Sequence, residues 1–167
     1  MNHHTHSFVL YNTPGTTTKN VKEIKRLGLK IKPGQGAAMQ RRAINLYLRK
    51  GAAMQVHQGS SLYVFPLLTK AYIEEIGDWI KANGGQFIVF DGGGDMQQVA
   101  DSLHDSFEFY LDELERLINK MKTQKKTTKA LEQIQEVQRI VSLNNRFMTV
   151  DQLNRAYQVC NIDFEES

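Results

Sequence analysis

Arg42, Asn45 and Arg49 have the side-chain types and the spacing to contact an anionic polymer. In a helix these three residues follow one another at i, i+3 and i+7, so they share one face, and Arg41 flanks them. Arginine makes bidentate contacts with phosphate or guanine, and asparagine is the usual partner of adenine in a major groove. A helix face of this kind usually carries acidic residues as well, and this one has none. The face predicts contact with nucleic acid, with a plain solvated face as the alternative.

These residues belong to a strongly basic stretch. Residues 19–50 contain ten lysines and arginines and one acid, Glu23, whereas the remainder is acidic and the whole chain has a formal charge of +3. Such an asymmetry indicates an anionic partner. The predicted nucleic-acid-binding residues are Lys22, Lys25, Arg26, Lys30, Lys32, Arg41, Arg42, Asn45, Arg49 and Lys50.

Three aromatic residues offer a second mode of binding. Tyr47, Tyr63 and Phe65 could stack on unpaired bases, although we expect at least two of them in the core. DNA and RNA, duplex or single-stranded, therefore all remain open.

A second charged pattern lies farther along the chain. Carboxylates spaced by four and three residues form an acidic stripe, which consists of Asp101, Asp105, Glu108, Asp112 and Glu115. The stripe is either a solvated face or a protein-interaction surface for a basic partner, for a second copy, or for the basic stretch of the same chain. Asp101, His104 and Glu108 also share a helix face, but we expect a surface histidine there rather than a metal site.

Residues 91–95, with the sequence DGGGD, are the one place where enzyme chemistry could lie. A glycine-rich turn between a strand and a helix can bind phosphate. The stretch matches neither common phosphate-binding motif, lacks a lysine, and contains Asp95, which would repel a phosphate. We expect a tight turn in which Asp95 caps the next helix, with Gln98 at its N3 position. Since no paired base and nucleophile is apparent, the sequence predicts a protein that is not an enzyme and has no cofactor.

Short strands and helices position the basic residues. Apolar and β-branched runs predict strands at residues 8–11, 54–57, 61–65 and 87–90, with a turn between the second and third. Breakers and capping residues predict helices at 20–28, 37–50 and 66–83. Gly51 is expected as the C′ residue of the second helix, whose Ala43, Leu46 and Tyr47 can face a core. Residues 29–32 alternate apolar and basic side chains, as in an exposed strand or arm.

Two further patterns concern how these elements are arranged. The strands at 61–65 and 87–90 flank a helix, so they are expected to be parallel in a βαβ unit. Residues 19–65 have the helix, helix, hairpin order of a winged helix, although the loop between the helices is longer than usual. The pentapeptide GAAMQ occurs at residues 36–40 and again at 51–55, which is too short a repeat for a solenoid.

The C-terminal part reads as helices. Residues 96–121 carry apolar residues at alternating spacings of four and three, a heptad pattern that must pack along its length. Residues 131–143 predict a returning helix that covers this seam. Thr149 and Gln152 have capping-box spacing before a last helix, in which Leu153, Ala156, Tyr157 and Cys160 are expected to face the core.

The sequence thus predicts an α+β fold. A basic α/β module at residues 1–95, with a winged-helix-like part at 19–65, precedes a helical hairpin at 96–167 that provides structure or oligomerisation. The longest apolar runs are far shorter than the roughly 20 residues that span a bilayer. No leader is apparent and there is a single cysteine, so we expect a cytoplasmic protein without a membrane partner. Nucleic-acid binding is the function that the sequence favours most. A protein-binding subunit or inhibitor is the second alternative. An enzyme that binds a phosphate or nucleotide ligand is the third.

Overall fold

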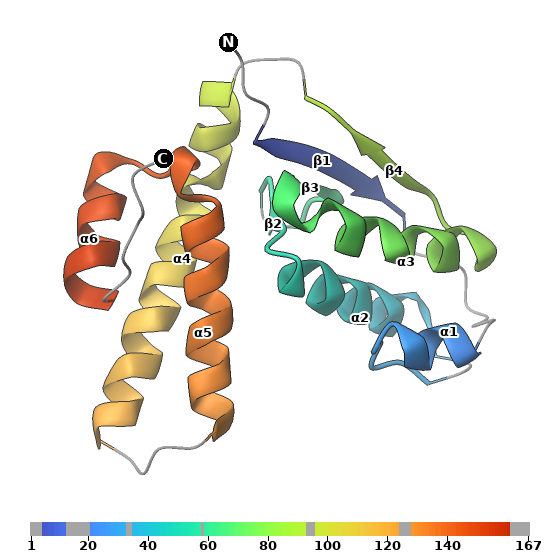
Figure 1. Cartoon of the computed structure of the whole chain (residues 1–167), viewed down its shortest axis with the longest axis horizontal. Helices are drawn as coiled ribbons and strands as arrows, with labels where there is room; N and C mark the ends of the chain where they lie inside the picture. The colour runs from blue at the N-terminus through green and yellow to red at the C-terminus, as the bar shows by residue number, and fades with distance from the viewer. Residues whose placement is uncertain are drawn as a thin grey trace. The chain divides into compact units, whose positions relative to one another are not determined.

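The computed structural model describes residues 5–12, 21–32, 35–57, 59–92, 96–123 and 128–160. The protein is mixed α+β, as predicted: a four-stranded antiparallel sheet with short helices is followed by long C-terminal helices (Figure 1). The chain divides into two compact units. Unit 1 comprises Met1–Gln55 and Gly59–Gly93, and unit 2 comprises Val56–Gln58 and Gly94–Ser167.

Unit 1 is built on a sheet with the strand order β2-β3-β1-β4. The strands are β1 (His6–Tyr11), β2 (Met54–Gln55), β3 (Leu62–Pro66) and β4 (Phe87–Phe90). β1 pairs antiparallel with both β3 and β4, and β2 pairs antiparallel with β3 as a hairpin. β3 and β4 therefore run in the same direction, as predicted, but β1 lies between them. Because β3 also pairs with β1, the hairpin belongs to the four-stranded sheet and is not a separate wing.

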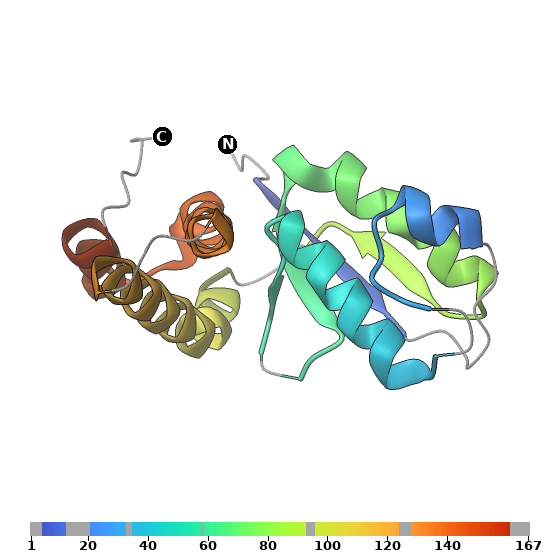
Figure 2. The same cartoon turned by 90° about the horizontal axis from the view of Figure 1, so that it is seen from below.

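The helices of unit 1 pack on one face of this sheet (Figure 2). They are α1 (Val21–Arg26), α2 (Ala37–Lys50) and α3 (Lys70–Ala82), the last preceded by a short 3-10 turn, η1 (Leu67–Thr69). Alternate strand residues such as Val9, Phe65 and Phe87 join the helices in one core. With α1 and η1 set aside, the elements of unit 1 follow the order β1-α2-β2-β3-α3-β4. Pro66 ends β3 and does not begin the helix, so the helix predicted at 66–83 starts later than expected.

The ends of α1 and α2 show where glycine is needed. Gly28 has a φ of 68° and follows α1, and the N–H of Leu29 donates to the carbonyl of Ile24 at 2.9 Å, so the predicted end at Gly28 is confirmed. After α2 the left-handed residue is Ala52, with a φ of 58°, and not Gly51. A Cβ atom at Gly51 would lie 2.5 Å from Cδ1 of Ile73, so this glycine permits close packing on α3.

The repeated pentapeptide GAAMQ brackets α2. The first copy, at residues 36–40, begins the helix, whereas the second, at 51–55, ends it and leads into β2. The same five residues therefore adopt two different structures, and the repeat is not a structural repeat.

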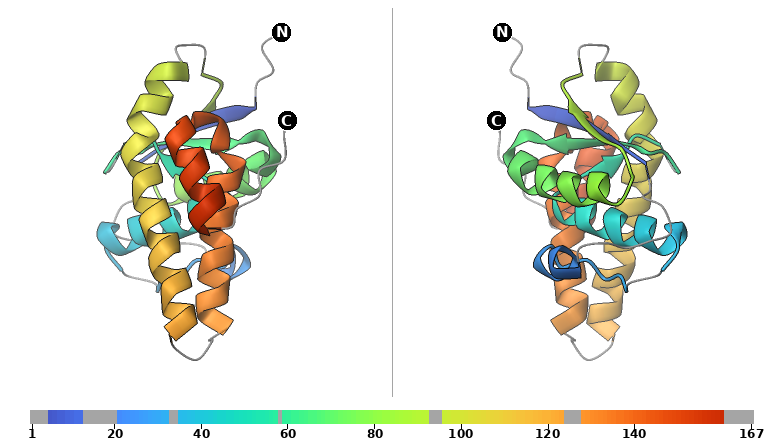
Figure 3. Two further views of the ribbon diagram at one scale, coloured as in Figure 1. Left: turned by 90° about the vertical axis from the view of Figure 1, so that its left-hand side faces the viewer. Right: turned by 90° about the vertical axis from the view of Figure 1, so that its right-hand side faces the viewer.

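Unit 2 consists of helices. α4 (Met96–Thr123) and α5 (Thr128–Leu143) run side by side, and α6 (Val150–Cys160) packs on α4 after a 3-10 turn, η2 (Asn145–Phe147) (Figure 3). The heptad pattern of α4 is confirmed, because Leu103, Phe107, Leu114 and Leu117 are buried. Of the residues expected in the core of the last two helices, Leu131 and Tyr157 are exposed instead, and the side chain of Cys160 lies outside the part that is described.

The predicted capping box at the start of α6 is confirmed. The N–H of Gln152 donates to Oγ1 of Thr149 at 3.2 Å, and the N–H of Thr149 donates to Oε1 of Gln152 at 3.1 Å. The other two predicted caps involve Asn20 and Asp95, which lie outside the described residues.

Candidate nucleic-acid interface

α2 buries one face and presents a basic one. Ala43, Ile44, Tyr47 and Leu48 lie in the core of unit 1, because the spacing of three and four residues places them on one side of the helix. Arg41, Arg42 and Lys50 are exposed, and Arg49 is half-buried. Leu46, which was predicted to face the core, is 43% exposed. It lies four residues from both Arg42 and Lys50, so it borders their exposed face.

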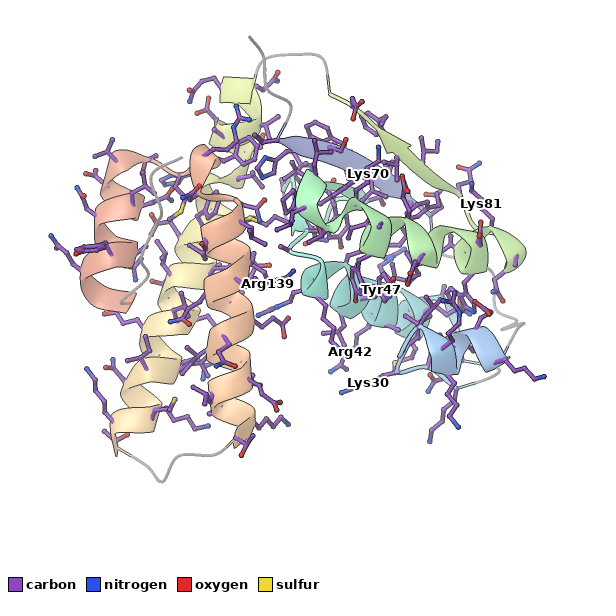
Figure 4. All side chains as sticks on the ribbon, in the orientation of Figure 1. Lys30, Arg42, Tyr47, Lys70, Lys81 and Arg139 are labelled. Carbon is purple, nitrogen blue, oxygen red and sulfur yellow. The ribbon has the colours of Figure 1, made fainter. Side chains whose placement is uncertain are left out.

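Residues 29–32 form an arm that anchors two more lysines. The alternation seen in the sequence is confirmed: Leu29 and Ile31 are buried in the core, whereas Lys30 and Lys32 are exposed. The arm is not part of the sheet. Figure 4 shows Lys30 and Arg42 on the same side of unit 1, away from α3. The buried apolar residues therefore fix the backbone from which both lysines project.

α1 contributes Lys22 and Lys25, both of which are exposed. The third predicted residue of this helix, Arg26, is already paired: its NH2 group lies 2.7 Å from Oε2 of Glu23, and its Nε donates to the same oxygen. The hydrogen bond from Arg26 lowers the pKa of Glu23, and the same contact raises the pKa of Arg26. Its charge is therefore partly neutralised within the chain.

We call the exposed basic residues of α1, the arm and α2, apart from the paired Arg26, the basic surface; they are Lys22, Lys25, Lys30, Lys32, Arg41, Arg42 and Lys50. Arg41, Arg49 and Lys50 make further contacts within the chain. Among the described residues, no acidic side chain is paired with Lys22, Lys25, Lys30, Lys32 or Arg42. The structure thus brings five of the ten predicted binding residues to the surface with no acidic partner among the described residues.

Asn45 is placed differently from the prediction that it contacts adenine. The hydroxyls of Tyr11 and Tyr63 both donate to its Oδ1 atom, each at 2.5 Å. These tyrosines come from β1 and β3, so Asn45 joins α2 to the sheet. Burial raises the pKa of the Tyr11 hydroxyl, against a smaller opposing effect of the hydrogen-bonded Tyr63 and of nearby Arg41. The role of Asn45 in the fold was not visible in the sequence, because its partners are 34 and 18 residues away.

The aromatic residues proposed to stack on bases are not available. Tyr47, Tyr63 and Phe65 are at most 4% exposed and belong to the core. The hydroxyl of Tyr47 donates to the carbonyl of Tyr72 at 2.5 Å, that of Tyr72 donates to the carbonyl of Tyr47 at 3.0 Å, and the two rings stack. Tyr47 and Tyr72 thus join α2 to α3. Because Tyr47, Tyr63 and Phe65 are all buried, they do not form a stacking platform.

In unit 2, a single arginine occupies most of the acidic stripe. The guanidinium of Arg155, on α6, lies 3.1 Å from Glu108, 2.6 Å from Asp112 and 2.8 Å from Glu115. The hydrogen bonds that Arg155 donates, to Asp112 first and to Glu115 next, raise its pKa. Of the five predicted protein-interaction residues, three are thus engaged within the unit, while Asp101 accepts a hydrogen bond from Gln97 and Asp105 is exposed.

Gln152 strengthens the same contact between α6 and α4. Besides capping α6, its buried side chain donates to the carbonyl of His104 at 3.1 Å and to Oε1 of Glu108 at 3.0 Å. The carboxylate of Glu108 lies 4.0 Å from His104 Nε2. Within the described residues, no group of three histidine, cysteine or acidic side chains could hold a metal ion.

The described part of the turn after β4, residues 91 and 92, supports the fold of the sheet. The hydroxyl of buried Ser7 donates to Oδ1 of Asp91, and a Cβ atom at Gly92 would clash with the ring of Phe8. Residues 93–95, which complete the predicted phosphate-binding turn, lie outside the described residues.

No protein-family model matches the chain, and comparison with curated proteins and with solved structures finds no significant match. In the part of the chain that is described, no helix combines the length and the apolar character needed to cross a membrane. The charge distribution divides along the two units: unit 1 contains twelve lysines and arginines against five acids, and unit 2 contains nine against thirteen. The candidate interface is therefore inferred from the residues of this chain alone.

Proposed function

We propose that the protein binds nucleic acid through the basic surface and that it does so without catalysing a reaction. The observation that carries the proposal is the exposure of Lys22, Lys25, Lys30, Lys32 and Arg42 without acidic partners among the described residues. Uncompensated basic side chains release counterions from a phosphate backbone when they bind it, and this release drives association.

The contrast with unit 2 supports this choice over a protein-binding role for the acidic stripe. Glu108, Asp112 and Glu115 already bind Arg155, so a partner would have to displace that arginine before using them. Replacing a formed charged contact yields less net free energy than engaging an unpaired charge. The basic surface is therefore the better candidate for an intermolecular contact.

A matched pair of charge reversals tests the proposal. Lys30→Glu/Arg42→Glu changes two residues of the basic surface, whereas Lys70→Glu/Lys81→Glu makes the same change of net charge on α3 (Figure 4). Fluorescence anisotropy with a labelled duplex should show a loss of affinity of about 100-fold or more for the first variant and of about threefold or less for the second. Equal losses in both variants would refute the proposal, as would a failure of the unmodified protein to bind either a duplex or a single strand.

A further inference from the structure

We infer that the basic surface contacts the phosphates of duplex nucleic acid and does not recognise adenine or cytosine. This inference rests on the proposed function and adds the class of ligand. It follows from two observations on the described residues of unit 1: the side-chain hydrogen-bond acceptors between residues 21 and 50 are already occupied or buried, and the aromatic residues predicted to stack on bases, Tyr47, Tyr63 and Phe65, are buried.

Reading adenine or cytosine in the major groove requires acceptors, because adenine N6 and cytosine N4 are donor groups, whereas guanine is read by donors alone. Between residues 21 and 50 the described side chains with an acceptor atom are those of Glu23, Gln35, Gln40, Asn45 and Tyr47. Arg26 holds Glu23, the backbone N–H of Lys32 donates to Gln35 Oε1 at 3.0 Å, and Gln40 and Tyr47 are buried.

Asn45 is the decisive residue. Bidentate recognition of adenine uses the amide oxygen and the amide nitrogen of asparagine together. In this structure the oxygen accepts from both Tyr11 and Tyr63, so only the nitrogen remains to bind a ligand. The groups left on the basic surface are lysine and arginine donors. Phosphate oxygens accept from such donors whatever the base sequence, and guanine O6 and N7 are the base atoms in the major groove that such donors can read.

The buried aromatic residues decide between duplex and single strand. Proteins that prefer single strands combine a basic groove with exposed aromatic rings on which the bases stack. Tyr47, Tyr63 and Phe65 are all in the core, so unpaired bases gain nothing from them. A surface that makes only phosphate contacts releases more counterions from a duplex than from a single strand, roughly 0.9 against 0.7 for each phosphate neutralised. It therefore binds the duplex more tightly.

Anisotropy titrations of the whole chain test this inference. The probes are an A·T-rich and a G·C-rich DNA duplex of equal length, an RNA duplex, and the oligo(dT) and oligo(dA) single strands. We expect the A·T-rich duplex to bind no more tightly than the G·C-rich duplex, and both DNA duplexes to bind about tenfold more tightly than either single strand. The RNA duplex shows whether the phosphate geometry of DNA or RNA fits better.

The Asn45→Ala variant separates a fold role from a reading role. If Asn45 only joins α2 to the sheet, the substitution lowers thermal stability but leaves the ratio of A·T-rich to G·C-rich affinities unchanged. A change of that ratio by more than about threefold would overturn the inference, as would tighter binding of a single strand than of a duplex. In both cases the protein would still bind nucleic acid, whereas a failure to bind any probe would refute the proposed function itself.

Discussion

Arg42 in unit 1 and Arg155 in unit 2 both lie on helices, but their surroundings differ. Arg42 is exposed and has no acidic partner among the described residues, whereas Arg155 contacts three carboxylates of α4. Unit 1 joins its helices through apolar packing and the hydroxyls of Tyr11, Tyr47, Tyr63 and Tyr72. Unit 2 adds charged and amide contacts between α4 and α6. The difference indicates that charge in unit 2 stabilises the fold, while charge in unit 1 is available for a ligand.

Reversing the charge of Arg155 should have the largest effect on stability. Arg155→Glu places a fourth carboxylate among Glu108, Asp112 and Glu115, so we expect a loss of about 2 to 4 kcal/mol in the free energy that holds α6 on α4. Hydrogen exchange of the α6 amides measures this loss. Arg116→Glu, an exposed site on α4, is the control and should cost less than about 1 kcal/mol. Equal protection in the Arg155 variant and the unmodified protein would show that the ion pairs are not structural.

Gln152→Glu should have the next largest effect. The substitution keeps the cap of α6 but places a carboxylate opposite Glu108, where the amide nitrogen now donates at 3.0 Å. We expect a loss of about 1.5 to 3 kcal/mol near pH 7. Because the close carboxyl pair favours a proton in the folded state, stability should recover as the pH falls. Gln158→Glu, exposed on the same helix, should show no such recovery, and the same pH profile in both variants would contradict the account of Gln152.

Alkaline pH should weaken unit 1 through its tyrosines. Burial, and then Tyr72 and Glu75, raise the pKa of Tyr47 well above its ordinary value of 10.0. Below pH 10.0, the ordinary pKa, Tyr47 keeps its proton in both the folded and the unfolded chain, so its ionisation does not affect stability. As the pH rises above this ordinary pKa, Tyr47 loses its proton in the unfolded chain but keeps it in the folded chain. The free energy of unfolding therefore falls by at most about 1.4 kcal/mol per pH unit.

Hydrogen exchange of α2 measures this alkaline loss, and Tyr47→Phe should reduce its steepness. Tyr157→Phe, at an exposed tyrosine of α6, is the matched control and should leave the pH dependence of α2 unchanged. If Tyr47→Phe also leaves it unchanged, ionisation of Tyr47 is not linked to the stability of unit 1.

The smallest effect on stability is expected for Arg42→Glu. Since Arg42 has no acidic partner among the described residues, its reversal should change the free energy of unfolding by less than about 0.5 kcal/mol. Thermal unfolding of this variant beside Arg155→Glu compares the two arginines directly. A loss as large as that of Arg155→Glu would remove the distinction between the two units.

Local patterns predicted most of the elements and the exposed lysines. Strand 87–90, the helix at 37–50 and the capping box at Thr149 follow from residues close together in the chain, and all three are confirmed. The alternation that exposes Lys30 and Lys32 is equally local. Such features depend on backbone periodicity and on hydrogen bonds within one turn, which the sequence displays directly.

The features that sequence reasoning missed depend on distant partners. Arg155 lies 40 to 47 residues from the carboxylates it binds, and Asn45 lies 34 residues from Tyr11. One signal was present: Arg155 is the sole basic residue between Phe147 and the end of an acidic C-terminal segment. No comparable signal distinguished Asn45 as a residue of the fold, because its neighbours on α2 are all basic or apolar.

The most direct test of the central claim is the salt dependence of duplex binding. If about half of the ten basic residues at 19–50 contact phosphates, log affinity should fall with log salt concentration at a slope of roughly −4 to −5. In Lys30→Ala/Arg42→Ala the slope should become shallower by roughly 1 to 2. A slope near zero for the unmodified protein, or the same slope in both proteins, would contradict the assignment of the basic surface as the binding site.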